Sequence, residues 1–122
     1  MSERNTTVRE TRHPVILATH IQPAIEDGAW IEVECVEAAE PSGNTHRGGW
    51  KIYVCALDPD GDVQRAVHVT GRNLEARIFK TVKGLTSFAL ELGLHVISFP
   101  VLAGKWGIWR FGTSKIPEDH SV

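Results

Sequence analysis

Hydrophobic and polar residues alternate most strictly between residues 29 and 37. A period of two over this length predicts a β-strand with one face toward the core and the other toward solvent. Two of the polar positions are glutamates, so we expect negative charge on the solvent-facing side. The expected core-facing residues are Ala29, Ile31, Val33 and Cys35, and the expected solvent-facing residues are Trp30, Glu32, Glu34 and Val36.

A β-hairpin is predicted between residues 50 and 70. Two β-rich runs in this region are separated by the sequence Asp-Pro-Asp-Gly-Asp. Proline at the first turn position and glycine at the left-handed position are typical of a type I turn followed by a bulge. The turn signal also predicts the register of the two strands, because loop length determines which residues face each other. A three-residue loop gives the pairs Leu57–Val63, Tyr53–Val67 and Ile52–His68.

The hydrophobic period changes to steps of three and four after residue 73, which predicts one long amphipathic helix over about residues 73–92. Asn73 is the expected N-cap, and Gly93 is the expected C-terminal stop. The opposite face of this helix is basic. The stripe positions are Leu74, Ile78, Val82, Leu85, Ala89 and Leu92, and the basic positions are Arg77, Lys80 and Lys83, with Arg72 just ahead.

Three further β-rich runs lie at residues 15–18, 95–101 and 104–111, and turn residues at 41–49 predict a flexible loop. Consecutive hairpin-linked strands favour an antiparallel sheet, and a single helix can cover only one of its faces. We therefore predict an α+β fold in which an antiparallel sheet of about five or six strands carries one long helix. The other face is left open to solvent or to a partner.

A chain of 122 residues is the usual size of one domain. Residues 1–12 are polar and aperiodic and are expected to be a disordered arm. Residues 13–112 are expected to form the domain, and residues 113–122 a flexible tail. The N-terminus has no apolar segment typical of a secretory signal, and no stretch approaches the ~20 apolar residues of a membrane span. We expect a cytoplasmic protein without membrane partners.

Acidic and basic side chains are sorted along the chain, although the net charge is only −2. Residues 1–40 hold eight carboxylates against three arginines, whereas residues 41–115 hold ten Lys and Arg against five Asp and Glu. A basic body of this kind is typical of proteins that bind polyanions.

The segment 105–111, Lys-Trp-Gly-Ile-Trp-Arg-Phe, carries the clearest candidate chemistry. Proteins that bind single strands combine cationic groups for the phosphates with flat aromatic rings for the bases. The competing interpretation is that these rings belong to the core or to a dimer interface, because large aromatic side chains in a small protein are usually buried. The candidate nucleic-acid-binding residues are Lys51, Tyr53, Arg65, Arg77, Lys80, Lys105, Trp106, Trp109 and Arg110.

The sequence contains no recognisable catalytic, cofactor or metal motif. Residues 58–62 resemble the start of a calcium loop, but its twelfth position is Val69 instead of glutamate. The six histidines show no zinc spacing. The expected register places Cys55 and His68 on opposite faces, which argues against a Cys–His dyad, and both Cys35 and Cys55 are expected to be reduced packing residues. We predict a non-catalytic protein with no cofactor and no metal.

Residues 49–83 combine a lysine-bearing strand, an Asp-rich turn, a second strand and a helix that opens with Leu-Glu. This order is similar to the single-stranded-DNA-binding transcriptional coactivator family. The resemblance implies dimerisation through the helix and binding of single strands by basic, aromatic-bearing sheets, with Lys51, Tyr53 and Arg65 as the matching residues. The chain departs from the family in the two strands expected after the helix.

The preferred hypothesis is non-catalytic binding of nucleic acid, single-stranded DNA or RNA before duplex, through a basic aromatic sheet face. The alternative is a protein-interaction or regulatory module whose aromatic strand forms a homodimer or contacts an unknown protein partner. We expect a homo-oligomer. Under the preferred hypothesis Lys51, Arg65, Lys105 and Arg110 contact phosphates, while Tyr53, Trp106 and Trp109 stack on bases.

Overall fold

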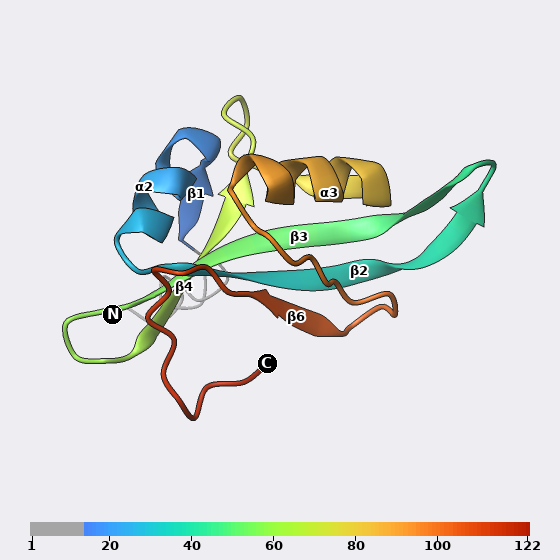
Figure 1. Ribbon diagram of the computed structural model, residues 1–122. Helices are drawn as coiled ribbons and strands as arrows, with labels where there is room; N and C mark the ends of the chain where they lie inside the picture. The colour runs from blue at the N-terminus through green and yellow to red at the C-terminus, as the bar shows by residue number, and fades with distance from the viewer. Residues whose placement is uncertain (1–13) are drawn as a thin grey trace, which may run out of the picture.

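The computed structural model describes residues 14–122, in which a twisted sheet carries short helices on one side (Figure 1). The fold is therefore α+β, but two parts of the predicted fold class are wrong, as described below. In chain order the elements are β1 (Val15–Leu17), the 3₁₀ turn η1 (Ala18–His20), α2 (Ile21–Glu26), β2 (Trp30–Ser42), β3 (Thr45–Leu57), β4 (Val63–Val69), β5 (Ile78–Thr81), α3 (Val82–Glu91) and β6 (Trp106–Trp109).

The six strands form a mixed sheet, so the prediction of a purely antiparallel sheet is wrong. The strand order is β1-β4-β3-β2-β6, and β5 pairs with β3 outside this path. β1 lies parallel to β4, with Ile16 opposite His68, whereas the other strand pairs of the described residues are antiparallel. A parallel pair needs a long connection, which here runs through α2 and the β2–β3 hairpin. No local pattern indicates where so distant a pairing will form.

The hairpin predicted between residues 50 and 70 is confirmed by β3 and β4. Leu57 faces Val63 and Tyr53 faces Val67, as expected from the turn. Asp58 Oδ1 accepts hydrogen bonds from the backbone N–H groups of Asp60 and Asp62, each at 2.9 Å. Gly61 has a φ of 89°, a left-handed conformation that glycine adopts at little cost. The three carboxylates thus belong to a turn.

β2 and β3 form a second and longer hairpin, so the flexible loop predicted at 41–49 is wrong, because these residues are strand on both sides of a two-residue turn. The two strands pair from Trp30 opposite Cys55 out to Ser42 opposite Thr45. Gly43 is the first residue of the two-residue turn and has a φ of 63°, as in the type II′ turns that suit twisted hairpins. Residues 37–49, here called the β2–β3 arm, project beyond the rest of the sheet (Figure 1).

The long helix predicted over residues 73–92 is wrong, because only its second half is helical. α3 has ten residues and begins after Thr81, whose hydroxyl accepts a 3.0 Å hydrogen bond from the Gly84 N–H. Thr81, not Asn73, is therefore the N-cap. Before it, β5 pairs with β3 and places Phe79 opposite Trp50. Steps of four from residue 74 fit a helix, but β-branched and aromatic residues at 78–81 also suit a strand, and pairing with β3 determines the outcome.

The core lies between one face of the sheet and the helices, and we call this face the covered face. The expected core-facing residues of β2 are buried there, as predicted. Residues 95–101, predicted to be a strand, are not a strand; they cross this side as irregular chain, and Phe99 packs against the core. The main buried side chains are Ile21, Ile25, Ile31, Val33, Cys35, Trp50, Ile52, Phe79, Leu85, Ala89 and Trp109.

The C-terminal residues differ from the flexible tail that was expected at 113–122, because they are bonded to the fold. Thr113 Oγ1 donates to the Ile25 carbonyl at 2.6 Å, and the Lys115 N–H donates to the Gly28 carbonyl at 2.8 Å. The predicted disordered arm at residues 1–12 lies outside the described residues. Among residues 14–122, no helix combines the length and the apolar character that a membrane crossing requires.

Candidate interaction surface

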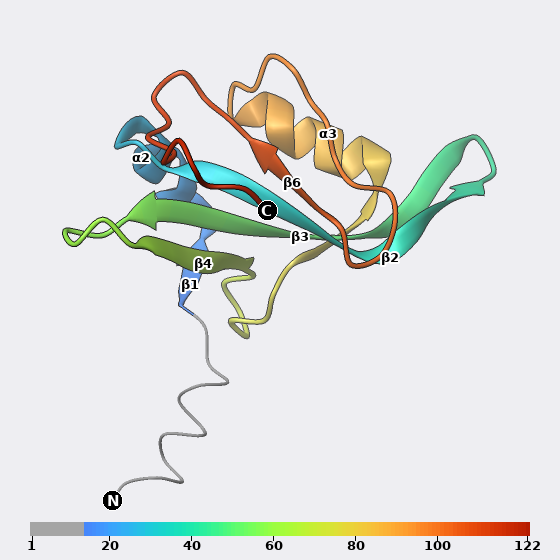
Figure 2. The same ribbon diagram turned by 90° about the horizontal axis from the view of Figure 1, so that it is seen from below.

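The sheet face opposite α3, here called the open face, gathers several of the predicted site residues. Figure 2 views the sheet from this side, with the C-terminal segment crossing part of it. The register determines which residues share the face, since directly opposed residues of antiparallel strands point the same way. The pairs on this face are Trp30–Cys55, Glu32–Tyr53, Glu34–Lys51, Cys55–Arg65, Tyr53–Val67, Lys51–Ile78, Glu32–Ile108 and Glu34–Trp106.

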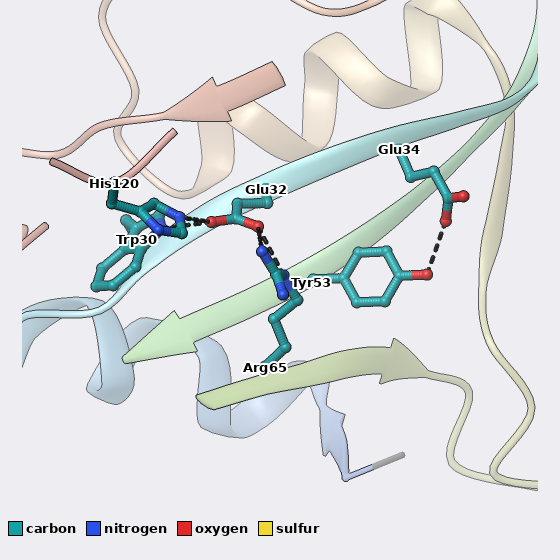
Figure 3. A network of polar contacts seen from close by, with 6 residues as sticks. All are labelled: Trp30, Glu32, Glu34, Tyr53, Arg65 and His120. Atoms are coloured by element: carbon teal, nitrogen blue, oxygen red, sulfur yellow. Dashed lines mark hydrogen bonds and ion pairs between the residues drawn. The ribbon is translucent and has the colours of Figure 1, made fainter. Parts of the chain in front are cut away.

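Glu32 is at the centre of a polar network on the open face (Figure 3). Its side chain is 0% exposed, although alternation predicted it in solvent. One carboxylate oxygen accepts from Trp30 Nε1 at 2.9 Å and lies 2.7 Å from His120 Nε2, and the other accepts from Arg65 Nε at 2.7 Å. His120 comes from the C-terminal segment. This segment therefore helps to enclose the end of the face that the alternation predicted to be exposed to solvent.

The network determines the charge states of its members. Burial by itself raises the pKa of the Glu32 carboxyl, but the hydrogen bonds from Trp30, His120 and Arg65 outweigh it and leave the pKa below its ordinary value. The pKa of Arg65 is raised, because its bond to Glu32 outweighs the effect of burial. Glu32 is therefore an anion and Arg65 its counter-ion, which leaves little positive charge at this point for an external phosphate.

Tyr53 and Trp106 form an aromatic pair next to this network. Their ring centroids are 5.0 Å apart with the planes tilted by 37°, and the Arg65 guanidinium lies 5.7 Å from the Trp106 ring centroid. The Tyr53 hydroxyl donates to Glu34 Oε1 at 2.8 Å, as Figure 3 shows. Burial, followed by this bond to an anion, raises the pKa of Tyr53, so the phenol stays protonated and in place. Both rings are half-buried.

Five of the nine predicted site residues point to the open face. They are Lys51, Tyr53, Arg65, Trp106 and Lys80, which follows Ile78 by two positions in β5. The prediction of Trp109 as a surface residue is wrong. It lies on the covered face, is 1% exposed, and donates from Nε1 to the Ser98 carbonyl at 2.7 Å. Trp30 and Trp50 are also fully buried, which agrees with the competing interpretation that the aromatic rings are mostly core.

The predicted cations nevertheless do not form one basic surface, because three of them lie elsewhere and Lys80 is paired with an acidic residue. Lys105 and Arg110 are exposed at the two ends of β6. Arg77 lies before β5, with its guanidinium 4.4 Å from the Phe79 ring centroid, and Lys80 in β5 pairs with Glu37 at 3.4 Å. Arg77 and Lys80 are outside α3, so the basic helix face that included them is wrong.

The sequence analysis missed Glu32, Glu34 and His120 as members of the site. Glu32 alternates like any solvent-facing residue of a strand, and the partners that allow its burial are 33 and 88 positions further along the chain. A local pattern cannot report such contacts. Trp30 beside Glu32 was the one available signal, because a large aromatic ring on the supposedly wet face indicates that something covers it.

The buried thiols do not supply a nucleophile to this surface. Cys35 and Cys55 are free and buried, in agreement with their prediction as packing residues. Burial, and next the negative charge of Glu32, raises the pKa of the Cys55 thiol, which keeps it in its unreactive neutral form. Among residues 14–122, no three His, Cys, Asp or Glu side chains gather as a metal site would require.

No protein-family model, no curated protein and no solved structure matches this chain. The resemblance of residues 49–83 to the single-stranded-DNA-binding coactivator family therefore stays a prediction.

Proposed function

We propose that this protein is a non-catalytic, cytoplasmic interaction module that binds a second copy of itself through the open face. The observation that carries the proposal is the cluster of Tyr53, Arg65 and Trp106, which Glu32 and Glu34 hold in place. Trp, Tyr and Arg are the residue types that dominate binding free energy at protein interfaces. Side chains that are fixed before binding lose less conformational entropy on association.

The apolar character of the same face supports a bound partner. Val67, Ile78 and Ile108 are half-buried and share the face with Tyr53 and Trp106. A sheet face that remains in water is ordinarily polar. Branched and aromatic side chains at these positions are more typical of a face that another protein covers.

The charges of the open face favour a second copy over a polyanion. Glu34 is opposite Lys51, and Glu32 is bonded to Arg65, so anions and cations alternate across the surface. A two-fold interface brings one patch against itself, so any charges in the patch must find charges of the opposite sign within the same patch. A polyanion gains affinity from cations that are free to bind phosphate, and Arg65 is already engaged by Glu32.

The proposal is tested by the molar mass of the protein in solution. Light scattering after gel filtration should give a dimer for the unmodified chain. Trp106→Ala should raise the dimer dissociation constant by about 1,000-fold, because the substitution removes an interface residue worth about 2 kcal/mol from each of the two protomers. Leu90→Ala is the control, because Leu90 is 62% exposed on α3, on the other side of the sheet. A monomeric unmodified chain, or equal dissociation constants for Trp106→Ala and Leu90→Ala, would contradict the proposal.

Binding of single-stranded nucleic acid is the second candidate, favoured by the presence of Lys51, Tyr53, Arg65 and Trp106 on one face. Because the other three tryptophans are buried, quenching by a base would report on Trp106. The same samples should therefore be titrated with oligo-dT at low salt. Quenching that salt reverses and Trp106→Ala removes would support this candidate, whereas unchanged emission would eliminate it.

A further inference from the structure

A cavity of about 410 Å³ opens at the edge of the sheet, at the ends of β1 and β4. It lies where η1 and the ends of β1 and β4 meet the segment before β5. This volume is within the range of small-molecule sites. Its surface is mostly apolar, and Arg77 is the cation among its lining residues. The residues that matter are Leu17, Ala18, Val69, Thr70, His68 and Arg77.

His68 lies just below the surface of this cavity, and its side chain carries an unpaired polar atom. The residue is 1% exposed, and its ring stacks on Phe88 with centroids 5.3 Å apart and planes 14° from parallel. Within the described part of the chain, His68 Nδ1 has no hydrogen-bond partner. A buried polar atom without a partner loses its hydration and gains nothing in return. Such an atom in a native protein requires an explanation, and a bound ligand is one.

Arg77 provides a cation next to this atom. Its backbone N–H donates to the His68 carbonyl at 2.9 Å, and its guanidinium lies over the Phe79 ring. Among the ion pairs formed by the described residues, none involves Arg77. Burial, and next the Arg77 charge, lowers the pKa of His68. The ring is therefore neutral at neutral pH, and Arg77 is the charge that an anion would meet.

We propose that this cavity binds a small carboxylate with an apolar body. The carboxylate would pair with the Arg77 guanidinium, whose planar donors match it in geometry. It would also accept a hydrogen bond from His68 Nδ1 once a shift of the side chain opens this buried atom to the cavity. The apolar body would rest on Leu17, Ala18 and Val69. None of Tyr53, Arg65 and Trp106 lines this cavity, so the proposal does not depend on self-association.

Benzoate is a suitable probe, and two matched compounds separate its parts. Benzyl alcohol has the same body without the charge, and inorganic phosphate has charge without the body. In calorimetric titrations, benzoate should be the one compound of the three that binds saturably. Its binding should also change the NMR chemical shifts of the His68 ring. Equal binding of benzyl alcohol, or no binding of benzoate, would overturn the proposal, and an ordered water would then be the partner of Nδ1.

Two variants test the residues. Arg77→Gln should weaken benzoate binding by about 10- to 100-fold, the usual effect of losing a hydrogen bond to a charged group. Arg72→Gln is the control, because Arg72 is exposed in the same segment and does not line the cavity. His68→Phe keeps an aromatic ring against Phe88 but lacks Nδ1, so it should bind benzoate at least tenfold more weakly (about the loss of one such hydrogen bond) without a fall in melting temperature. Undiminished binding by Arg77→Gln would overturn the proposal even if His68→Phe failed to fold.

Discussion

Glu32 shows at the scale of one residue how a charge can be held where water is excluded. Removing a carboxylate from water is costly unless hydrogen bonds and an opposite charge replace its hydration. Trp30, Arg65 and His120 provide these contacts, and both carboxylate oxygens have partners. Arg65 remains 43% exposed, so part of the ion pair stays hydrated and only the carboxylate is fully enclosed.

This arrangement predicts acid sensitivity. The pKa of Glu32 is lower in the folded state than its ordinary value of 4.5. Its contribution to the free energy of unfolding is therefore complete above about pH 4.5 and is lost as pH falls through the folded-state pKa. Glu32→Gln should lower the free energy of unfolding at pH 7 by about 2 kcal/mol, since hydrogen bonds to a charged group are lost. It should also flatten the loss of stability on acidification.

Urea unfolding from pH 3 to pH 7 measures both effects. Glu40→Gln is the matched control, because Glu40 is an exposed residue of the same strand. The interpretation of Glu32 would be contradicted if the two variants had the same stability at pH 7 and the same dependence on pH.

The elements show where a local pattern is sufficient. The turn at residues 58–62 carries its own hydrogen-bond acceptor and a glycine at the left-handed position, so its register could be predicted to the residue. By contrast, residues 78–81 fit either a strand or a helix, and their pairing with β3, which begins 33 positions earlier at Thr45, decides between the two. Propensity is a weak guide when such pairing is available.

The packing at the base of the β2–β3 arm requires glycine at position 48. A Cβ atom at Gly48 would lie 2.8 Å from Trp50 Cη2 and 3.0 Å from the Glu37 carbonyl oxygen. Trp50 is fully buried, and its Nε1 donates to the Pro100 carbonyl at 2.8 Å. The ring therefore cannot move without losing core contacts and this hydrogen bond.

Gly48→Ala should lower the free energy of unfolding by about 1–3 kcal/mol, the usual cost of adding a methyl group to a packed site. Chemical denaturation followed by tryptophan fluorescence measures it. Gly112→Ala is the control, since nothing lies within 4 Å of a Cβ at that position. Equal midpoints for the two variants would show that the arm tolerates movement of Trp50.

At the scale of the whole molecule, the sheet separates residues that the sequence places together. Trp106 and Trp109 are three positions apart, so in a strand they point to opposite faces, and one is half-buried while the other is core. The predicted site therefore included both rings of the open-face cluster, Tyr53 and Trp106, but also Trp109, which belongs to the core. The hydrogen bonds around Glu32 could not be predicted, because one of its partners is His120, from the last three positions of the chain.

The C-terminal segment should therefore be necessary for the stability of the whole fold. Deleting residues 113–122 removes the bonds of Thr113, Ser114 and Lys115 to residues 25–29, as well as the His120 contact with Glu32. It also removes the ring that packs edge-on against Trp30 at 5.6 Å. We expect a loss of about 2–3 kcal/mol in the free energy of unfolding, the scale of exposing one large side chain, with a red shift in tryptophan emission.

Deleting residues 121–122 alone is the control, because both are exposed. An unchanged urea midpoint for the longer deletion would contradict this role of the segment.

The same two proteins also provide a second test of the proposed dimer. Trp106 lies opposite Glu34, two residues along β2 from the Glu32 that His120 contacts. Under conditions where the shortened chain stays folded, it should therefore keep the dimer mass, since the cluster of Tyr53, Arg65 and Trp106 is retained.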